Sequence, residues 1–160
     1  MADDIASSSG VKFFIGPVNN AANDAAAYAL LTWTEVEPTE SIGEFGDQAT
    51  AVNFTALSDS RVRKAKGTDD AGDITVVCGD SPRNVGQIAL KAAAKTKFAY
   101  AFKAVLADAP DADSTDTIHY FRGKVMSSRL GGLSANSVVT RNFNVAIDSE
   151  IIEVPTAENP

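Results

Sequence analysis

The chain has 160 residues, of which 44% are hydrophobic and 22% charged, and this composition is typical of a single globular domain rather than a disordered tail. It contains no apolar run near the ~20 residues that a membrane helix needs, and its start, Met1-Ala2-Asp3-Asp4, lacks the basic residues of a signal peptide. The single Cys78 excludes an intramolecular disulfide and fits a reducing compartment. We therefore expect a protein that is made and kept inside a cell.

The net charge of −7 is unevenly distributed along the chain. Between Phe13 and Ser60 there is no lysine or arginine but there are seven acidic residues, whereas from Arg61 onward 13 basic residues face 12 acidic ones. The first third is therefore acidic and the remainder nearly neutral. We expect the acidic part to be either a solvated surface or one that repels nucleic acid or meets a basic patch on a neighbour.

The first third of the chain predicts two strands. Residues 11–15 form a short apolar run that stops at Gly16-Pro17, and residues 28–37 combine β-branched and aromatic side chains up to Pro38. Between these strands, residues 19–27 are polar and rich in alanine, which predicts a loop or a turn of weak helix.

A long acidic loop follows at residues 39–48, with the sequence Thr-Glu-Ser-Ile-Gly-Glu-Phe-Gly-Asp-Gln. Long loops in compact domains are usually functional or disordered. Two apolar side chains in such a polar loop must be buried, either by the loop's own domain or by a partner. We predict a subunit interface in this loop, formed by Glu40, Ile42, Glu44, Phe45 and Asp47.

The next segment predicts a strand at residues 51–57 and a hairpin in which residues 61–66 pair with residues 73–78 across the turn-rich segment 67–72. The first hairpin strand carries four basic residues, Arg61, Arg63, Lys64 and Lys66. They could contact phosphates, protect a sheet edge by their charge, or pair electrostatically with the acidic loop. The absence of interleaved aromatic residues favours the last two alternatives.

One flanking helix is expected at about residues 82–95, with Ser81 as its N-cap and Pro82 in the first position. Its apolar residues recur at helical spacing, and its polar residues lie opposite them. The expected apolar stripe is Val85, Ile88, Ala89, Ala92 and Ala93, and the expected polar face is Arg83, Gln87, Lys91 and Lys95. Such a helix needs an apolar sheet face to cover.

The remaining segments predict that sheet. Residues 98–106 alternate strictly, with Phe98, Tyr100, Phe102, Ala104 and Leu106 on one face. Further strands are expected at 118–127, 137–147 and, at an edge, 151–154. The fold class is therefore mainly β (α+β), a β-sandwich or partly rolled barrel of about eight strands with one helix. We expect a single domain over residues 1–160, with 1–10 and 155–160 as loose termini or assembly arms.

The sequence offers little catalytic or metal-binding chemistry. The lone His119 has no second histidine or cysteine near it, and no Gly-x-Ser-x-Gly motif is present. Asp69, Asp70 and Asp73 do not follow the spacing of an EF-hand, and a polar turn accounts for them. We expect no catalytic residue, no metal and no cofactor, and thus no enzyme.

Eight short pieces in order carry a resemblance to a known family. They are Trp33-Thr-Glu-Val-Glu37, Glu40-Ser-Ile-Gly-Glu-Phe-Gly-Asp47, Val52-Asn-Phe-Thr-Ala-Leu57, Arg61-Val-Arg-Lys-Ala-Lys-Gly67, Gly86-Gln-Ile-Ala-Leu90, Tyr100-Ala-Phe102, Gly123-Lys-Val125 and Ser137-Val-Val-Thr140. They are spread in order along residues 28–147, so that the resemblance extends over most of this range, and with this spacing the chain resembles a tail tube protein of long-tailed (siphovirus-type) bacteriophages.

The resemblance implies a structural protein of the virion tail that is made in the cytoplasm of an infected bacterium. Six subunits would form a ring whose inner sheets join into a β-barrel, and rings would stack into a tube. Its lumen would hold the tape-measure protein and later pass double-stranded DNA without specific binding, and tail-tip and terminator proteins would be further partners. Glu35 and Glu37 are candidates for acids that face the lumen.

Two other functions remain open from the sequence. One is the ring-forming inner tube protein of a contractile tail or secretion machine, which shares the fold. The other, of a different class, is a soluble β-sandwich binding module, which would be a monomer with an exposed aromatic patch.

Overall fold

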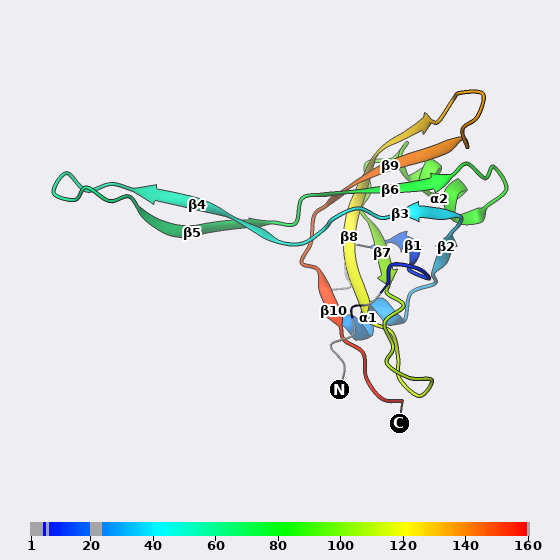
Figure 1. The fold of residues 1–160 in the computed structure, drawn as a ribbon, viewed down its shortest axis with the longest axis horizontal. Helices are drawn as coiled ribbons and strands as arrows, with labels where there is room; N and C mark the ends of the chain where they lie inside the picture. The colour runs from blue at the N-terminus through cyan, green and yellow to red at the C-terminus, as the bar shows by residue number, and fades with distance from the viewer. Residues whose placement is uncertain (1–4, 6, 20–23, 160) are drawn as a thin grey trace.

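The computed structural model describes residues 5, 7–19 and 24–159, and within them the chain is mostly β-strand with two short helices (Figure 1). In chain order the elements are β1 (Lys12–Val18), α1 (Ala25–Ala29), β2 (Thr34–Val36), β3 (Thr39–Ser41), β4 (Gln48–Phe54), β5 (Arg63–Asp70), β6 (Asp73–Gly79), α2 (Val85–Ala93), β7 (Tyr100–Val105), β8 (Ile118–Gly131), β9 (Thr140–Ile147) and β10 (Ile152–Val154). The prediction of a mainly β fold is confirmed.

The body of the molecule is one antiparallel sheet in the order β2-β1-β7-β8-β9-β6-β3, with β10 paired to β8. Strand β8 is 14 residues long; its first part pairs with β7 and its second part with β9. The two end strands, β2 and β3, are separated along the chain only by Glu37-Pro38. The sheet therefore curves until its ends lie near one another, which gives a sandwich-like body.

The core fills the concave side of this sheet. Strands β1, β6, β7, β8 and β9 each place every second side chain there, as the period-two rule requires. Its largest fully buried aromatic residues are Phe13, Phe102, Phe121 and Phe143, and Phe102 stacks on both Phe13 and Phe121 with ring centroids 5.6 Å apart. The alternation predicted for residues 98–106 is correct over β7, although Phe98, which precedes the strand, is 59% exposed.

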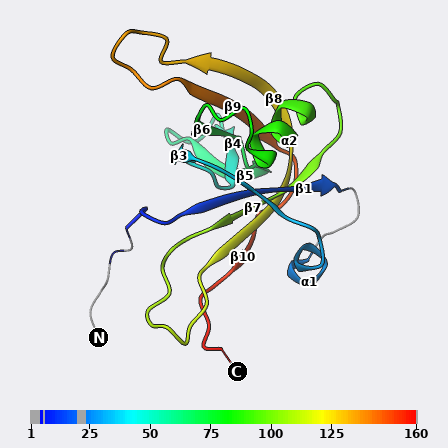
Figure 2. The same cartoon turned by 90° about the vertical axis from the view of Figure 1, so that its right-hand side faces the viewer.

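A second, smaller cluster lies on the other face of the sheet, beneath α1. Tyr28 stacks on Tyr120 at 5.3 Å, and Trp33 packs against the same ring at 5.9 Å. Asp24 caps the helix by accepting a hydrogen bond from Ala27 N at 2.7 Å. The predicted strand at 28–37 is thus wrong in its first half, because Tyr28 belongs to a helix. Figure 2 shows the two helices on separate parts of the body.

The predicted flanking helix exists as α2, but it starts later and faces the core differently than expected. Its N-cap is Asn84 rather than Ser81, and its buried residues are Gly86, Gln87, Leu90 and Ala93. Val85 and Ile88, assigned above to the apolar stripe, are 66% and 49% exposed. The reason is a close approach of two backbones, since a Cβ on Gly86 would overlap the backbone of Glu35 and Val36.

Gln87, expected on the polar face, is completely buried and joins the two ends of the sheet. Its amide nitrogen donates to the carbonyl oxygens of Glu37 at 2.6 Å and Gly79 at 2.8 Å. Its amide oxygen accepts from Ser81 N at 3.1 Å. Glu37 follows β2 and Gly79 ends β6, so one side chain satisfies backbone groups from both ends of the curved sheet.

The predicted hairpin of residues 61–66 with 73–78 is wrong. Strand β5 continues to Asp70, through the segment expected to turn, and pairs with β4 in a separate two-stranded sheet. Strand β6 instead pairs with β9 and β3. The turn occurs at Ala71-Gly72, where Gly72 has a φ of +73°.

The terminal segments are described only in part, since residues 1–4, 6 and 160 lie outside the described residues, as do 20–23 of the predicted loop. Near the C-terminus, Asn159 N donates to Asp113 O at 2.7 Å and Thr115 N donates to Ala157 O at 2.8 Å. These bonds hold the last described residues against the turn between β7 and β8.

Replacing Gln87 with alanine should lower the free energy of unfolding by about 3 kcal/mol, because it leaves three backbone groups without their buried partner. Chemical denaturation followed by circular dichroism measures this change. Gln48, at the exposed start of β4, supplies the matched control, since Gln48→Ala should change stability by less than about 0.5 kcal/mol. Equal effects at both positions would contradict a structural role for Gln87.

Candidate assembly interface

The most unusual feature of the molecule is an arm formed by β4, β5 and the connection between them, which projects from the body (Figure 1). The strands pair from Gln48 with Asp70 at the base to Phe54 with Arg63 near the tip. The tip is held locally, since Asp59 N donates to Ala56 O at 3.1 Å and Arg61 N donates to an Asp59 carboxylate oxygen at 3.1 Å. No other strand of the described residues pairs with this two-stranded sheet.

Several large apolar side chains of the arm are exposed to solvent. Val52, Phe54 and Val62 are 54%, 64% and 49% exposed, and Leu57 at the tip is fully exposed. An isolated two-stranded hairpin is at best marginally stable in water, and exposed apolar surface on a projecting element marks a binding surface. The arm therefore has the properties of an element that is completed by another molecule.

The four basic residues singled out in the sequence all lie on this arm, and all are exposed: Arg61, Arg63, Lys64 and Lys66. Arg63 pairs with Asp59 at 3.2 Å and Lys66 with Asp69 at 3.5 Å, both exposed contacts within the arm. Arg61 and Lys64 form no ion pair among the described residues. Within one subunit, the ion pairs of these residues involve the arm's own acids and not the loop at 39–48.

The loop predicted as an interface has two different parts. Ile42 and Phe45 are half-buried and pack against the core of their own subunit, and the Phe45 ring lies 5.5 Å from His119 and 5.9 Å from Phe121. The acidic residues Glu40, Glu44 and Asp47 are exposed. Of the two alternatives stated above for Ile42 and Phe45, the structure shows burial by the loop's own domain.

The two acids suggested for a lumen lie on or beside β2. Glu35 is half-buried within the strand, and Glu37 is exposed just after it. Burial raises the pKa of Glu35, a hydrogen bond and the charge of Glu37 raise it further, and Lys12 acts in the opposite direction. Burial and a neighbouring like charge both disfavour the ionised form of a carboxyl, so Glu35 keeps its proton to a higher pH than a free glutamate does.

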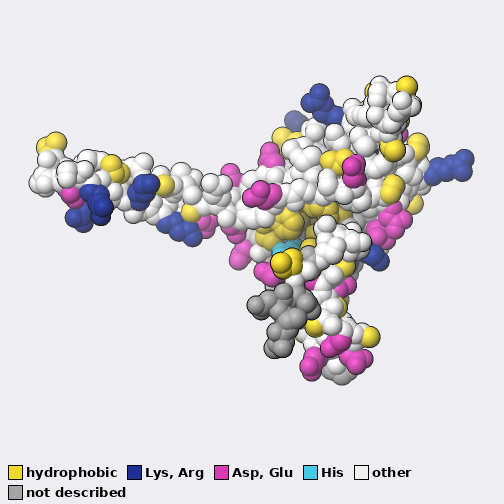
Figure 3. All heavy atoms as spheres, viewed as in Figure 1, with side chains coloured by type: hydrophobic (Ala, Val, Ile, Leu, Met, Phe, Trp, Pro, Cys, Tyr) yellow, Lys and Arg dark blue, Asp and Glu magenta, His cyan; other side chains and the backbone are white. Residues whose placement is uncertain are grey.

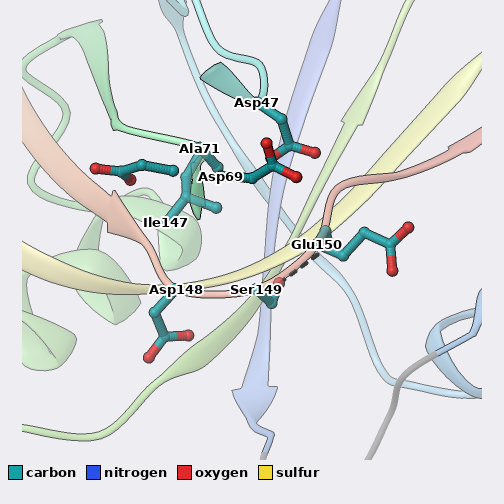
Figure 4. A pocket seen from close by; sticks show the side chains of 8 residues that line it. Asp47, Asp69, Ala71, Ile147, Asp148, Ser149 and Glu150 are labelled. Atoms are coloured by element: carbon teal, nitrogen blue, oxygen red, sulfur yellow. Dashed lines mark hydrogen bonds between the residues drawn. The ribbon is translucent and has the colours of Figure 1, made fainter. Parts of the chain in front are cut away.

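Acidic residues also surround the base of the arm, where two open hollows of about 570 and 580 Å³ flank it. Figure 4 shows the side chains that line the first, which come from three separate segments of the chain. Its acidic lining residues are Asp47, Asp69, Asp70, Asp148 and Glu150, and Ala71 and Ile147 supply an apolar part. No local sequence pattern predicts this cluster, because its members are brought together only by the junction of β4, β5 and the segment after β9.

Cys78 and His119, the one cysteine and the one histidine of the chain, both lie on strands of the body. Burial raises the pKa of the Cys78 thiol to about 11, although a hydrogen bond with Thr39 opposes this shift, so the thiol is not activated. Nδ1 of His119 is buried without a hydrogen-bond partner. Among the described residues, no cluster of three His, Cys, Asp or Glu could hold a metal ion, and neither helix is long and apolar enough to cross a membrane.

Comparison with known proteins identifies the family. A profile described as "Phage tail tube protein, TTP" matches residues 19–155, which is most of the chain. The chain belongs to the phage tail tube protein family. The resemblance seen in the sequence is thereby confirmed, and the chain is a structural subunit of a tail tube. None of the curated proteins compared by sequence matches it.

Solved structures share the fold at low sequence identity. A chain of the anti-feeding prophage baseplate superposes with a TM-score of 0.70 at 10% identity, covering 97% of this chain and 98% of that one. A chain from the sheath-tube complex of an extracellular contractile injection system gives 0.66 at 10%, with coverage of 96% and 93%. The SPP1 tail tube gives 0.62 at 12%, with coverage of 94% and 80%. This tail tube protein therefore shares its fold with chains from an extracellular contractile injection system and from the SPP1 tail tube.

A pair of phenylalanines tests the division between folding and assembly in this tail tube protein. Phe45→Ala should lower the free energy of unfolding by about 2 kcal/mol, less than for a fully buried ring, because the side chain is half-buried on the core. Phe54→Ala, on the arm, should change it by less than about 0.5 kcal/mol. Thermal or chemical unfolding of the unassembled subunit measures both, and a larger loss from Phe54→Ala would contradict the arm's independence.

Proposed function

We propose that this chain, acting as one tail-tube domain, forms rings of six that stack into a tube, and that its arm joins one copy to another. The arm carries the proposal, because an unsupported two-stranded sheet with exposed Val52, Phe54 and Val62 requires a partner surface. In a homopolymer that partner is a second copy. The exposed acids Glu44 and Asp47 lie beside the base of the arm. They would border the same contact, together with Glu40 on β3 and with Ile42 and Phe45, which hold the loop in place.

Two open strand edges support closure into a ring. Pairing of β7 with β8 ends at Tyr100 and Gly123, so the second half of β8 has β9 on one side and no described strand on the other. At the far end of the sheet, β3 pairs only with β6 among the described strands. Unprotected edges are an aggregation hazard that oligomerisation removes. Pairing β8 of one copy with β3 of the next would make the four strands β8-β9-β6-β3 part of a continuous wall.

The charge of the chain fits a conduit for DNA. A ring of six subunits at −7 each would carry −42. Acidic walls repel phosphate, so double-stranded DNA could pass without sticking. Glu35, on β2, and Glu37, between β2 and β3, are proposed to add negative charge at the border of this wall. The tape-measure protein would fill the tube first, and tail-tip and terminator proteins would bind its ends. The tube would form in the cytoplasm of the bacterial host and then become part of the virion tail. This structural role uses no catalytic chemistry.

A second candidate is the inner tube of a contractile tail or injection machine. The similarity to chains from an extracellular contractile injection system, at TM-scores of 0.67 and 0.66, favours keeping it. The two candidates share the arm, the ring and the tube, and they differ in whether a sheath surrounds the tube. Genes beside this one would separate them: a tape-measure gene alone indicates a non-contractile tail, and an added sheath gene a contractile one.

Negative-stain microscopy of the purified protein should show rings or hollow tubes. The double substitution Val52→Ala with Phe54→Ala should raise the protein concentration needed for assembly by at least about tenfold, since central apolar contacts dominate interface energies. Light scattering over a concentration series measures it. The matched control is Val85→Ala with Ile88→Ala, which removes exposed apolar surface from α2 instead. A wild-type protein that stays monomeric at every concentration and ionic strength would contradict the proposed function.

A further inference from the structure

The outer half of the arm has a charge opposite to that of the rest of the chain. Residues 51–67 contain four basic residues and one acidic residue, which gives them a net charge of +3. Since the whole chain carries −7, the remaining residues together carry −10. Figure 3 shows Lys and Arg side chains along the outer arm and Asp and Glu side chains where the arm joins the body. The arm is thus a basic projection from an acidic body.

These two charged surfaces cannot meet within one subunit. Arg63 lies opposite Phe54, six residues along β4 from Gln48 at the base, which is about 20 Å at ~3.3 Å per residue. The pairing of the strands keeps the arm extended, so the tip cannot fold back on its own base. A contact between the two surfaces must therefore join two copies.

We propose that the basic outer arm of one subunit docks into the acidic hollow at the base of the arm of a second copy. The inference deepens the proposed function, on which it rests, by naming the surface that receives the arm. In the free subunit, Asp47, Asp70 and Glu150 have no ion-pair partner among the described residues, and Arg61 and Lys64 on the arm have none either. Docking would bring these two unpaired sets together.

The shape and composition of the hollow fit such an occupant. It has a volume of about 570 Å³ and contains Ala71 and Ile147 beside its carboxylates, so it offers both charge and some apolar surface to an arm that carries both. The carboxylates form no metal-binding cluster among the described residues, which favours a basic peptide segment over a metal ion as the occupant. Because the two surfaces differ, the contact is heterologous and propagates instead of closing as a two-fold dimer.

Charge reversal on each side, alone and together, tests the docking. Arg61→Glu with Lys64→Glu reverses two charges on the arm, and Asp47→Lys with Glu150→Lys reverses two of the five charges in the hollow. Each double variant should raise the concentration needed for assembly by about tenfold or more near 0.1 M salt, because like charges would then face each other. The quadruple variant should assemble like the wild type, and an equimolar mixture of the two double variants should co-assemble.

The controls separate docking from folding and from net charge. All four positions are exposed, so the midpoint of thermal unfolding of the quadruple variant should match that of the wild type. The quadruple variant has the same net charge as the wild type, and Arg83→Glu with Lys95→Glu repeats the arm's charge change on other exposed residues and should leave assembly within about threefold. The docking would be overturned by double variants that assemble normally, or by a quadruple variant that does not recover assembly. The proposed function would still stand in that case, provided that the wild type forms tubes. Failure of the wild type to assemble would overturn both.

Discussion

The buried amide of Gln87 is the interaction on which the shape of the subunit depends. A strongly curved sheet brings its two ends together and leaves backbone groups there without strand partners, and a buried unpaired group is costly. Gln87 satisfies the carbonyl groups of Glu37 and Gly79 and the N–H of Ser81 at once. Gly86 permits this by letting the helix backbone lie directly on β2. The same closure fixes β3, and through β3 it fixes the place where the arm leaves the body.

Folding and assembly are assigned to different parts of the chain. The apolar side chains of the large sheet are buried together with α2 and supply the stability of the body, whereas the arm exposes Val52 and Phe54 and pairs with no strand of the body. Phe45 and Ile42 connect the two parts, since they anchor the segment between β3 and β4 on the core. A loop that sequence reasoning treats as a docking surface is thus also the anchor that directs the arm.

Sequence reasoning succeeded where one rule of periodicity determines burial. Phe102 and Ala104 in β7 were predicted correctly, because every second side chain of a half-buried strand meets the core. It failed where a small or polar residue carries the packing: Gly86 and Gln87 contribute nothing to an apolar stripe. The turn residues at 67–72 misplaced the hairpin because Gly67 lies within β5, where an added Cβ would come within 2.8 Å of Thr50 O. The acidic hollow joins segments about 80 to 100 residues apart in the sequence, so no local pattern reveals it.

The separation of a basic outer arm from an acidic base has a consequence for the completed tube. If every arm enters the hollow of a copy in the adjacent ring, the tube has a direction, and its two ends are chemically different. One end presents free arms with a net positive outer half and exposed aromatic and aliphatic side chains, and the other presents empty acidic hollows. A protein that begins the tube and a protein that stops it must then offer opposite surfaces, one acidic and grooved, the other basic and projecting.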